Sequence, residues 1–339
     1  MILVTGGTGL VGAHLLAQLV QTETRIRAIY RTEKKLEAVK NVFRYYFEDV
    51  PYFYDKIEWH KADMIDVPSL EAVFPDITHV YHVAALVTFD PKRFEELRKV
   101  NIEGTANIVN LCIAYGVKKL CFVSSIAAIG ETENPEIPIT EETHWNAEAD
   151  NNVYAISKYG SEMEVWRGSQ EGLKVVIVNP GIILGAGFWR GGGSGSLIRK
   201  IDKGLKYYTK GILAYVDVVD VVNAMIQLME SDSSHERFIL VAENWTVQKF
   251  SETTAKALNV SPPKKEASAF LLGIAWRMDW WRQFFTGKHR RLTRLTARSI
   301  QSQMVYDSRK IKEQLNFNFT PLEQTIARIS ERYKIDKAQ

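Results

Sequence analysis

The feature that most constrains this chain is the regular alternation, through its first half, of short apolar runs and amphipathic stretches. The apolar or β-branched runs are MILVT, RIRAIY, IEWHKAD, THVYHVAA, KKLCFVSS and LKVVIVNP. Such β-α alternation predicts a parallel sheet with helices on both faces. Because the crossover connections of parallel strands are right-handed, we expect a doubly wound α/β sheet.

A glycine-rich turn follows the first of these runs. In TGGTGLVGAHLL, Gly6, Gly9 and Gly12 stand between a predicted strand and a helix that begins at Leu10. Glycines permit a tight turn in which backbone amides and the start of the helix, at Leu10 and Val11, approach a pyrophosphate. The turn therefore predicts a dinucleotide site in a Rossmann-like domain. The alternative is a turn whose glycines serve packing alone.

The end of the second predicted strand indicates which dinucleotide binds. An acid at this place would accept hydrogen bonds from a free ribose 2′-hydroxyl, but IRAIYRTEKK puts Tyr30 and Arg31 there, followed by two lysines. This cationic cluster suits a 2′-phosphate, so we predict NADP(H) rather than NAD(H). A solvated helix start is the alternative. Further candidate cofactor contacts lie at the ends of later strands: Asp63, Met64, Ala84, Ala85 and Pro180.

A tyrosine and a lysine stand four residues apart in NNVYAISKYGSEMEVW. On a helix, Tyr154 and Lys158 would share one face. A phenol titrates near pH 10 in water, and an adjacent ammonium lowers that pKa, which would give a usable general acid-base. The alternative is an ordinary surface pair. Ser124 and Ser125 end the fifth strand, and Asn101 opens the helical stretch KVNIEGTANIVNLC.

These motifs, in order over nearly the whole chain, resemble the extended short-chain dehydrogenase/reductase superfamily. That superfamily includes NAD-dependent epimerases and dehydratases, dihydroflavonol 4-reductases and 3β-hydroxysteroid dehydrogenases. The motifs that carry the resemblance are TGGTGLVG, HVAA, VNIEGT, VSS, YAISK, NPG, YVDVVDV and YDSRKIKEQLNF.

The resemblance implies roles for four residues. Tyr154 would donate a proton to a carbonyl oxygen as hydride reaches its carbon. Lys158 would lower the pKa of Tyr154 and hold the nicotinamide ribose, and Ser125 rather than Ser124 would hydrogen-bond the substrate oxygen. Asn101 would support a water-linked proton relay, with a structural amide as the alternative.

Three departures from the superfamily's sugar-nucleotide enzymes favour a different reaction. Ile126 and Ala127 follow the active-site serine where dehydratases carry Asp-Glu, and Ile182 in NPGIILGAG replaces a polar anchor for a diphosphate. The cluster at Arg31 favours exchangeable NADP(H) over retained NAD. We therefore predict an NADP(H)-dependent oxidoreductase that interconverts a carbonyl and a secondary alcohol on a relatively apolar small molecule. An NAD-retaining epimerase and a non-catalytic dinucleotide sensor are the alternatives.

The chain beyond Pro180 follows a different pattern. We predict a glycine-rich loop, GFWRGGGSGS, that closes over substrate or is an insertion without a role. YVDVVDVVNAMIQLME predicts a strand end and a helix, RFILVA a further strand, and the chain from Thr246 is mostly helical. The expected dinucleotide-binding domain comprises residues 1–180 and 212–243, and the expected substrate domain residues 181–211 and 244–339.

AFLLGIAWRMDWWRQFF is predicted to form a helix with one apolar stripe. The stripe comprises Phe270, Ile274, Met278, Trp281 and Phe285. We expect it to be the core contact of the smaller domain. It could instead wall an apolar pocket or, with the following KHRRLTR, dock on a membrane surface.

Composition indicates no macromolecular partner beyond a second copy. The 43 basic and 40 acidic residues leave a net charge of only +3, so neither nucleic acid nor stable membrane association is expected. Cys112 and Cys121 lie in apolar contexts, which predicts reduced core thiols and no metal site. With MILVTGG read as a strand and no apolar run of about 18 residues, we expect a cytoplasmic protein. By resemblance, a homodimer would pair through residues 101–115 and 154–168.

Overall fold

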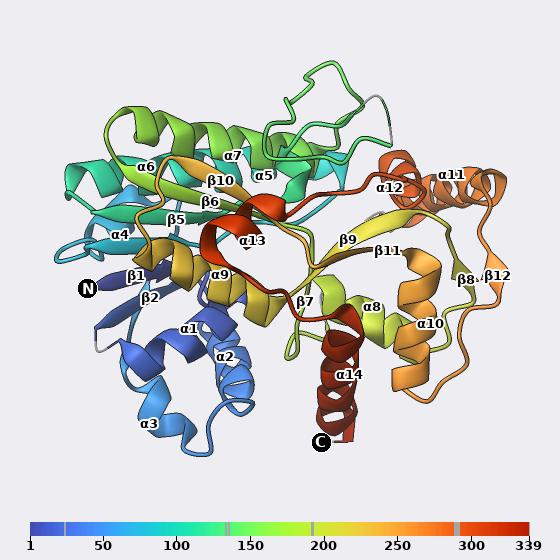
Figure 1. Ribbon diagram of the computed structural model, residues 1–339, viewed down its shortest axis with the longest axis horizontal. Coiled ribbons are helices and arrows are strands. Elements are labelled where there is room, and N and C mark those ends of the chain that lie inside the picture. Colours follow the sequence, from blue (N-terminus) through green and yellow to red (C-terminus); the bar gives the residue numbers. More distant parts are fainter. Residues whose placement is uncertain (24, 133, 135, 191–192, 288–291, 339) are drawn as a thin grey trace.

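A seven-stranded sheet forms the centre of the protein in a computed structural model, which describes residues 1–23, 25–132, 134, 136–190, 193–287 and 292–338 (Figure 1). The strand order is β10-β6-β5-β4-β1-β2-β3, and every neighbouring pair is parallel. The strands are β1 Ile2–Thr5, β2 Ile26–Tyr30, β3 Ile57–Lys61, β4 His79–His82, β5 Lys119–Val123, β6 Lys174–Pro180 and β10 Glu236–Leu240. The predicted doubly wound, Rossmann-like α/β fold is confirmed.

Helices cover both faces of this sheet because successive strand residues point to opposite faces. Leu3 and Val4 of β1 are both fully buried, one in each of two apolar layers. One face carries α1 Leu10–Thr22, α2 Leu36–Phe43, α3 Val50–Tyr54 and α9 Val218–Glu230. The other carries α4 Val67–Glu71, α5 Phe94–Leu97, α6 Gly104–Ala114 and α7 Val153–Gln170 (Figure 1). Cys112 and Cys121 are buried free thiols within these layers, as predicted.

A smaller region lies beside the carboxyl ends of the large sheet. Its three-stranded sheet has the order β11-β9-β7, and two short strands pair as β12-β8. The strands are β7 Ile182–Leu184, β8 Tyr207–Tyr208, β9 Ile212–Asp217, β11 Glu243–Thr246 and β12 Lys265–Glu266. The helices are α8 Gly193–Asp202, α10 Val247–Ala257, α11 Ala269–Thr286, α12 Arg294–Ser299 and α14 Leu322–Ala338. A further helix, α13 Arg309–Leu315, packs against β10 of the large sheet instead. The predicted division into two domains, like the predicted homodimer, stays a prediction.

The glycine-rich stretch differs from the predicted loop. Residues 187–196 were expected to be irregular throughout, but α8 already begins at Gly193. A Cβ at Gly195 would stand 2.2 Å from the carbonyl oxygen of Phe188, so glycine lets this helix pack closely against the preceding backbone. Gly191 and Gly192, which belong to the same stretch, lie outside the described residues.

The expected core stripe of α11 is wrong, because all five of its residues are exposed. Their exposed fractions are Phe270 80%, Ile274 41%, Met278 66%, Trp281 53% and Phe285 74%. The buried side chains of this helix are Leu272 and Gln283 instead. The residues 288–291 of the KHRRLTR segment lie outside the described residues. Within the described part of the chain, α11 and the other helices are too short or too polar to cross a membrane.

Candidate active site

A cavity of about 1310 Å³ opens at the carboxyl ends of the central strands, where a doubly wound sheet binds its ligand. The predicted site residues that line it are Gly6, Gly9, Leu10, Val11, Arg31, Asp63, Met64, Ala84, Ala85, Ser125, Tyr154 and Lys158. Four others, Gly12, Tyr30, Asn101 and Pro180, lie outside its lining. The fold thus brings together residues that are up to 152 positions apart in the sequence.

The glycine turn between β1 and α1 packs against the end of β4. Gly6 adopts a φ of 69°, and a Cβ there would stand 2.6 Å from the amide nitrogen of Ala84. A Cβ at Gly12 would stand 2.2 Å from the carbonyl oxygen of Gly6. Gly9 has more room, since a Cβ there would be 3.4 Å from the same oxygen. Gly6 and Gly12 therefore close the turn, while Gly9 and the unpaired amides that begin α1 face the cavity.

Two cations line the cavity just after the end of β2. Arg31 and Lys35 both line it, and Arg31 is more than half exposed. A guanidinium nitrogen of Arg31 is 3.9 Å from a carboxylate oxygen of Asp63, so an acid faces the cluster from the end of β3. The ring of Tyr30 points elsewhere and packs edge-on against Trp59, with 6.4 Å between ring centroids.

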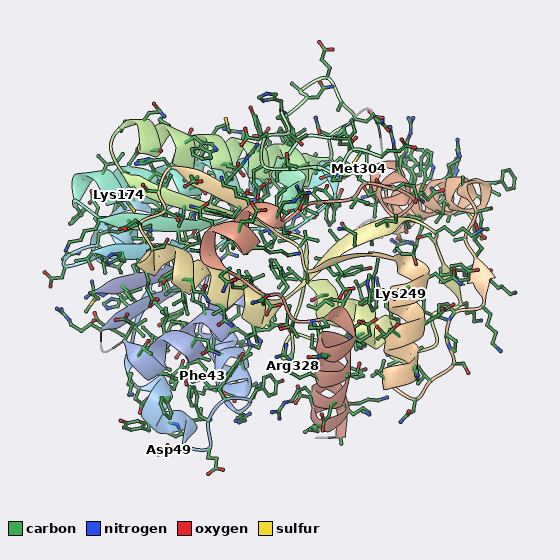
Figure 2. All side chains as sticks on the ribbon, viewed as in Figure 1. Phe43, Asp49, Lys174, Lys249, Met304 and Arg328 are labelled. Atoms are coloured by element: carbon green, nitrogen blue, oxygen red, sulfur yellow. The ribbon has the colours of Figure 1, made fainter. Side chains whose placement is uncertain are left out.

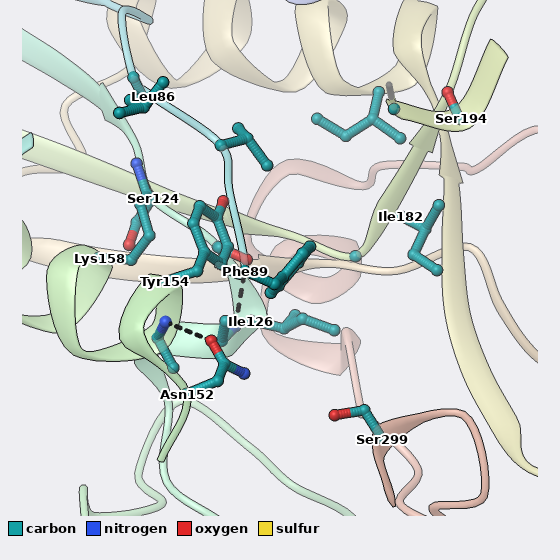
Figure 3. A pocket seen from close by; sticks show the side chains of 18 of the residues that line it. Leu86, Phe89, Ser124, Ile126, Asn152, Tyr154, Lys158, Ile182, Ser194 and Ser299 are labelled. Carbon is teal, nitrogen blue, oxygen red and sulfur yellow. Dashed lines mark hydrogen bonds between the residues drawn. The ribbon is translucent and has the colours of Figure 1, made fainter. Parts of the chain in front are cut away.

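Tyr154 sits in the first turn of α7. Asn152 caps this helix, because its side-chain oxygen accepts a 2.9 Å hydrogen bond from the amide of Ala155. The phenol ring meets the ring of Phe89 edge-on at 5.3 Å, as Figure 3 shows. Loss of solvation raises the pKa of Tyr154, and a side-chain hydrogen bond with Ser125 acts in the opposite direction. Ser125 is thus the serine beside the phenol, in agreement with the preference stated from the sequence.

Lys158 is buried one turn further along α7, with 2% of its surface exposed. Its Nζ donates a 2.8 Å hydrogen bond to the carbonyl of Val123 and lies 4.7 Å from the ring centroid of Phe122. Burial lowers the pKa of Lys158 to about 8, against the opposing attraction of Glu162. The expectation that Lys158 holds the pKa of Tyr154 below 10 is wrong for this structure, because burial of the phenol outweighs other influences.

Glu162, one further turn along α7, was missed from the sequence. Its carboxylate is fully buried and accepts hydrogen bonds from Ser124 at 2.7 Å and from the amide of Asn179 at 2.9 Å. The guanidinium of Arg237 pairs with it at 3.2 Å and also donates to the carbonyl of Glu141. Asn179 additionally donates to the carbonyl of Ser125. The four-residue spacing after Lys158 could have indicated Glu162, since residues four apart share a helix face.

Asn101 lies outside the cavity lining and is held by three hydrogen bonds. It lies in a π-helical segment, Arg98–Glu103, and is buried. Its amide nitrogen donates to the carbonyl of Leu86 and to the hydroxyl of Ser157, both at 3.0 Å, while its oxygen accepts from the amide of Leu86 at 2.7 Å. Asn101 therefore fixes the chain segment at Leu86, which lines the cavity. Its part in a proton relay stays a prediction.

The half of the cavity beyond Tyr154 is mostly apolar. Figure 3 shows Phe89, Ile126 and Ile182 around this space, with Ser194 and Ser299 at its far side. The wall is completed by apolar residues of the smaller region: Leu197, Leu213, Leu272, Trp276, Leu295 and Met304. Charged residues Glu131, Asp150, Arg294 and Arg298 also line it. One cavity therefore joins a glycine-lined half suited to a dinucleotide with an apolar half, and Tyr154 lies between them.

Comparisons with solved structures agree with this architecture. The protein gox2253 superposes with a TM-score of 0.82 at 24% identity, covering 99% of this chain and 98% of that one. UDP-glucose 4-epimerase from Thermotoga maritima gives a TM-score of 0.78 at 20% identity, covering 99% of both chains. These likenesses concern the fold.

Comparisons with curated sequences give relatives with reductase names. A putative dihydroflavonol 4-reductase of Synechocystis is 27% identical over 80% of this chain and 77% of its own. Cinnamoyl-CoA reductase 1 of Oryza sativa is 26% identical over 71% of each chain. Sterol demethylase protein B of Methylococcus capsulatus is 26% identical over 92% of each chain.

A family model covers most of the chain. The description of this family is "NAD dependent epimerase/dehydratase family", and the match runs over residues 2–242, from the first strand of the large sheet to the end of its last. The resemblance to extended short-chain dehydrogenases/reductases that the motifs predicted is thereby confirmed. The chain belongs to the NAD-dependent epimerase/dehydratase family.

Proposed function

We propose that this protein is an NADP(H)-dependent oxidoreductase that interconverts a carbonyl and a secondary alcohol on an apolar small molecule. The observation that carries the proposal is the position of Tyr154, which lies beside Ser125 at the junction of the two halves of one cavity. The relatives named as reductases support the same reaction class.

The residues of the first half fit a dinucleotide. Gly6 and Gly12 form a turn that no side chain could enter, and Gly9, Leu10 and Val11 line the cavity where a pyrophosphate would meet the helix start. A volume of about 1310 Å³ exceeds the range typical of a site for one small ligand, which leaves room for cofactor and substrate together. When bound, the nicotinamide would supply hydride to the carbonyl carbon, or accept it from the alcohol carbon.

Side chains of this protein would transfer the proton and orient the substrate. Tyr154 would donate its phenolic proton to the substrate oxygen in reduction and take it back in oxidation. Ser125, which lies beside the phenol and acts on its pKa, would hold that oxygen. Lys158 would hold the nicotinamide ribose, and with a pKa lowered only to about 8 it stays mostly protonated at neutral pH.

The substrate class follows from the walls of the other half. Ile126 and Ile182 stand where the family's sugar-nucleotide enzymes carry polar residues, and both line the cavity. Phe89 and Trp276 add aromatic surface. An apolar ketone or alcohol would bury its surface against these apolar and aromatic side chains.

Tyr154→Phe tests the reaction. The variant should bind NADPH with unchanged affinity in a fluorescence titration and lose turnover of apolar ketones by at least about a hundredfold, the upper range of general acid catalysis being about 10⁴. Ser299→Ala, also at the cavity wall but across from the phenol, is the matched control and should retain activity (Figure 3). Retained turnover in the Tyr154 variant would exclude the mechanism.

Arg31→Ala tests the cofactor. Because Arg31 is the guanidinium at the cavity's edge, its loss should weaken NADPH about tenfold or more and change NADH binding little. An equal loss for both nucleotides would remove the assignment of NADP(H). If the purified protein instead retains NAD that only denaturation releases, an epimerase becomes the better proposal, and binding of neither nucleotide would contradict the enzymatic function altogether.

A further inference from the structure

Helix α11 exposes an unusually large apolar surface. Eight of its side chains are exposed large apolar residues: Phe270, Leu271, Ile274, Met278, Trp280, Trp281, Phe284 and Phe285. At 3.6 residues per turn they cover about half of the helix circumference. The last four pack on one another as an aromatic cluster, with centroids 5.1 Å apart for Trp280 and Trp281. Patches of this extent on a folded protein mark an interaction surface.

The sequence from α11 through α12 is rich in cations, of which Arg282 pairs with Asp279, and Arg294 and Arg298 line the cavity. From residue 269 to residue 300 the sequence contains seven Lys or Arg and a single Asp, a net charge of +6, although the whole chain carries only +3. Three of the seven, Lys288, Arg290 and Arg291, lie outside the described residues. Among the described ones, Arg277 stacks on Trp276 and belongs to α11 itself. Trp and Phe on one face with nearby Lys and Arg are typical of helices that lie in the interface of an anionic membrane.

We propose that the exposed face of α11 docks on the surface of a bilayer containing anionic lipids, with the helix lying in the interface. The helix carries Arg277, Asp279 and Arg282, which suits an interfacial position and not a spanning one. This reverses the expectation, drawn from the overall charge, that the protein has no membrane partner. The overall charge conceals the asymmetry because the remainder of the chain is net acidic.

A second copy of the chain fits this surface less well. Pairing α11 with its symmetry mate would bring two helices together that each carry two Arg and one Asp, and like charges across an interface oppose association. Anionic headgroups would neutralise the same charge. The position of α11 also suits a lipid surface, since Figure 1 shows it at the outer edge of the molecule, beside α12 and away from the large sheet.

The opposite face of α11 forms part of the cavity wall. Ala269, Leu272, Gly273 and Trp276 line the apolar half described above. Docking through the exposed face would therefore set this half of the cavity next to the lipid surface, within reach of molecules that partition into bilayers. The docking itself rests on the exposed face and the charge alone, independently of the proposed reaction.

Vesicle sedimentation tests the docking. The purified full chain is mixed at low salt with vesicles of phosphatidylcholine alone, or with added phosphatidylglycerol. We expect binding to the anionic vesicles, and a loss of about a hundredfold in partitioning for Trp281→Glu/Phe285→Glu, since each aromatic contributes about tenfold through buried area. Tyr52→Glu/Ile335→Glu is the matched control, because these apolar residues are also exposed and Tyr52 lies in α3 at the opposite end of the molecule (Figure 1).

Several outcomes would overturn the proposal. The wild-type chain could remain in the supernatant with both kinds of vesicle, bind neutral and anionic vesicles equally, or bind them as well after the double substitution in α11. A wild-type dimer that Trp281→Glu/Phe285→Glu converts to monomer, without vesicle binding, would assign the face to a second copy. NADPH titration of the same variants separates this question from the proposed function, because α11 lies outside the glycine-lined half.

Discussion

Replacing Lys158 by Met should stabilise the folded protein at neutral pH while it removes turnover. Burial lowers the pKa of Lys158 from its ordinary 10.5 to about 8, so folding penalises its charged form. At 1.36 kcal/mol per pKa unit, the penalty at neutral pH is about 3 kcal/mol. Met is unbranched and uncharged and fills the same space. The carbonyl of Val123 would lose its donor, which costs about 1–2 kcal/mol, and a net gain of about 1–2 kcal/mol remains.

The dependence on pH distinguishes this explanation from a general packing effect. Between the folded pKa near 8 and the unfolded value of 10.5, the unfolded wild-type chain binds more protons than the folded one. The contribution of Lys158 to stability therefore rises with pH through this window. Because the Met variant lacks that rise, its advantage should shrink from about pH 8 upward. It should disappear or reverse near pH 10, where the penalty that remains is smaller than the cost of the lost hydrogen bond.

Urea unfolding followed by tryptophan fluorescence at several pH values from about 7 to 10 measures the difference. Lys174→Met is the control, since this lysine is exposed at the start of β6 (Figure 2) and its loss should change the free energy of unfolding by no more than about 0.5 kcal/mol. The reasoning is refuted if Lys158→Met is less stable than the wild type near pH 7, or if its effect on stability is the same at all pH values.

Three further substitutions test the site. Gly12→Ala should destabilise the protein and abolish NADPH binding, because its Cβ would stand 2.2 Å from the Gly6 oxygen. Gly9→Ala, whose Cβ would stand 3.4 Å from the same oxygen, should keep the fold and weaken only binding. Thermal unfolding and NADPH titration compare the two variants, and equal unfolding temperatures would contradict the clash. Glu162→Gln should cost about 3 kcal/mol by leaving the partly buried guanidinium of Arg237 without its fully buried carboxylate partner. It should also lower the pKa of Lys158 further, which moves the alkaline limb of the activity profile to lower pH, and an unchanged profile would show that the carboxylate does not act on the site.

The sequence predicted those parts of the site whose positions are determined by local sequence pattern and by the geometry of parallel strands. The glycine turn, the serine at the end of β5 and Tyr154 on α7 meet in one cavity because parallel strands end at one edge of the sheet. The side-chain directions could not be predicted. Lys158 points to the carbonyl of Val123, and Asn101 bonds to Leu86, through tertiary contacts that spacing along one helix does not reveal.

Helical periodicity has a related limit, which α11 illustrates. The pattern correctly indicates an apolar stripe that includes Phe270, Trp281 and Phe285. Such a stripe can pack against the protein core, a ligand, a partner or lipid, and the pattern does not say which. Only the packing of Leu272 into the remainder of the smaller region shows that the predicted stripe points outward.

Along α7, burial of the side chains increases with each turn, and the residues of successive turns have different roles in the site. Tyr154 is partly exposed to the cavity, Lys158 is 2% exposed and Glu162 is completely buried. Without the nearby carboxylate of Glu162, the pKa of the buried Lys158 ammonium would fall still further. That carboxylate is itself held in place by Ser124 and Arg237. Glu162 does not line the cavity, yet it sets the charge of a group that does. The chemistry available at the phenol therefore depends on a buried polar network that no substrate touches.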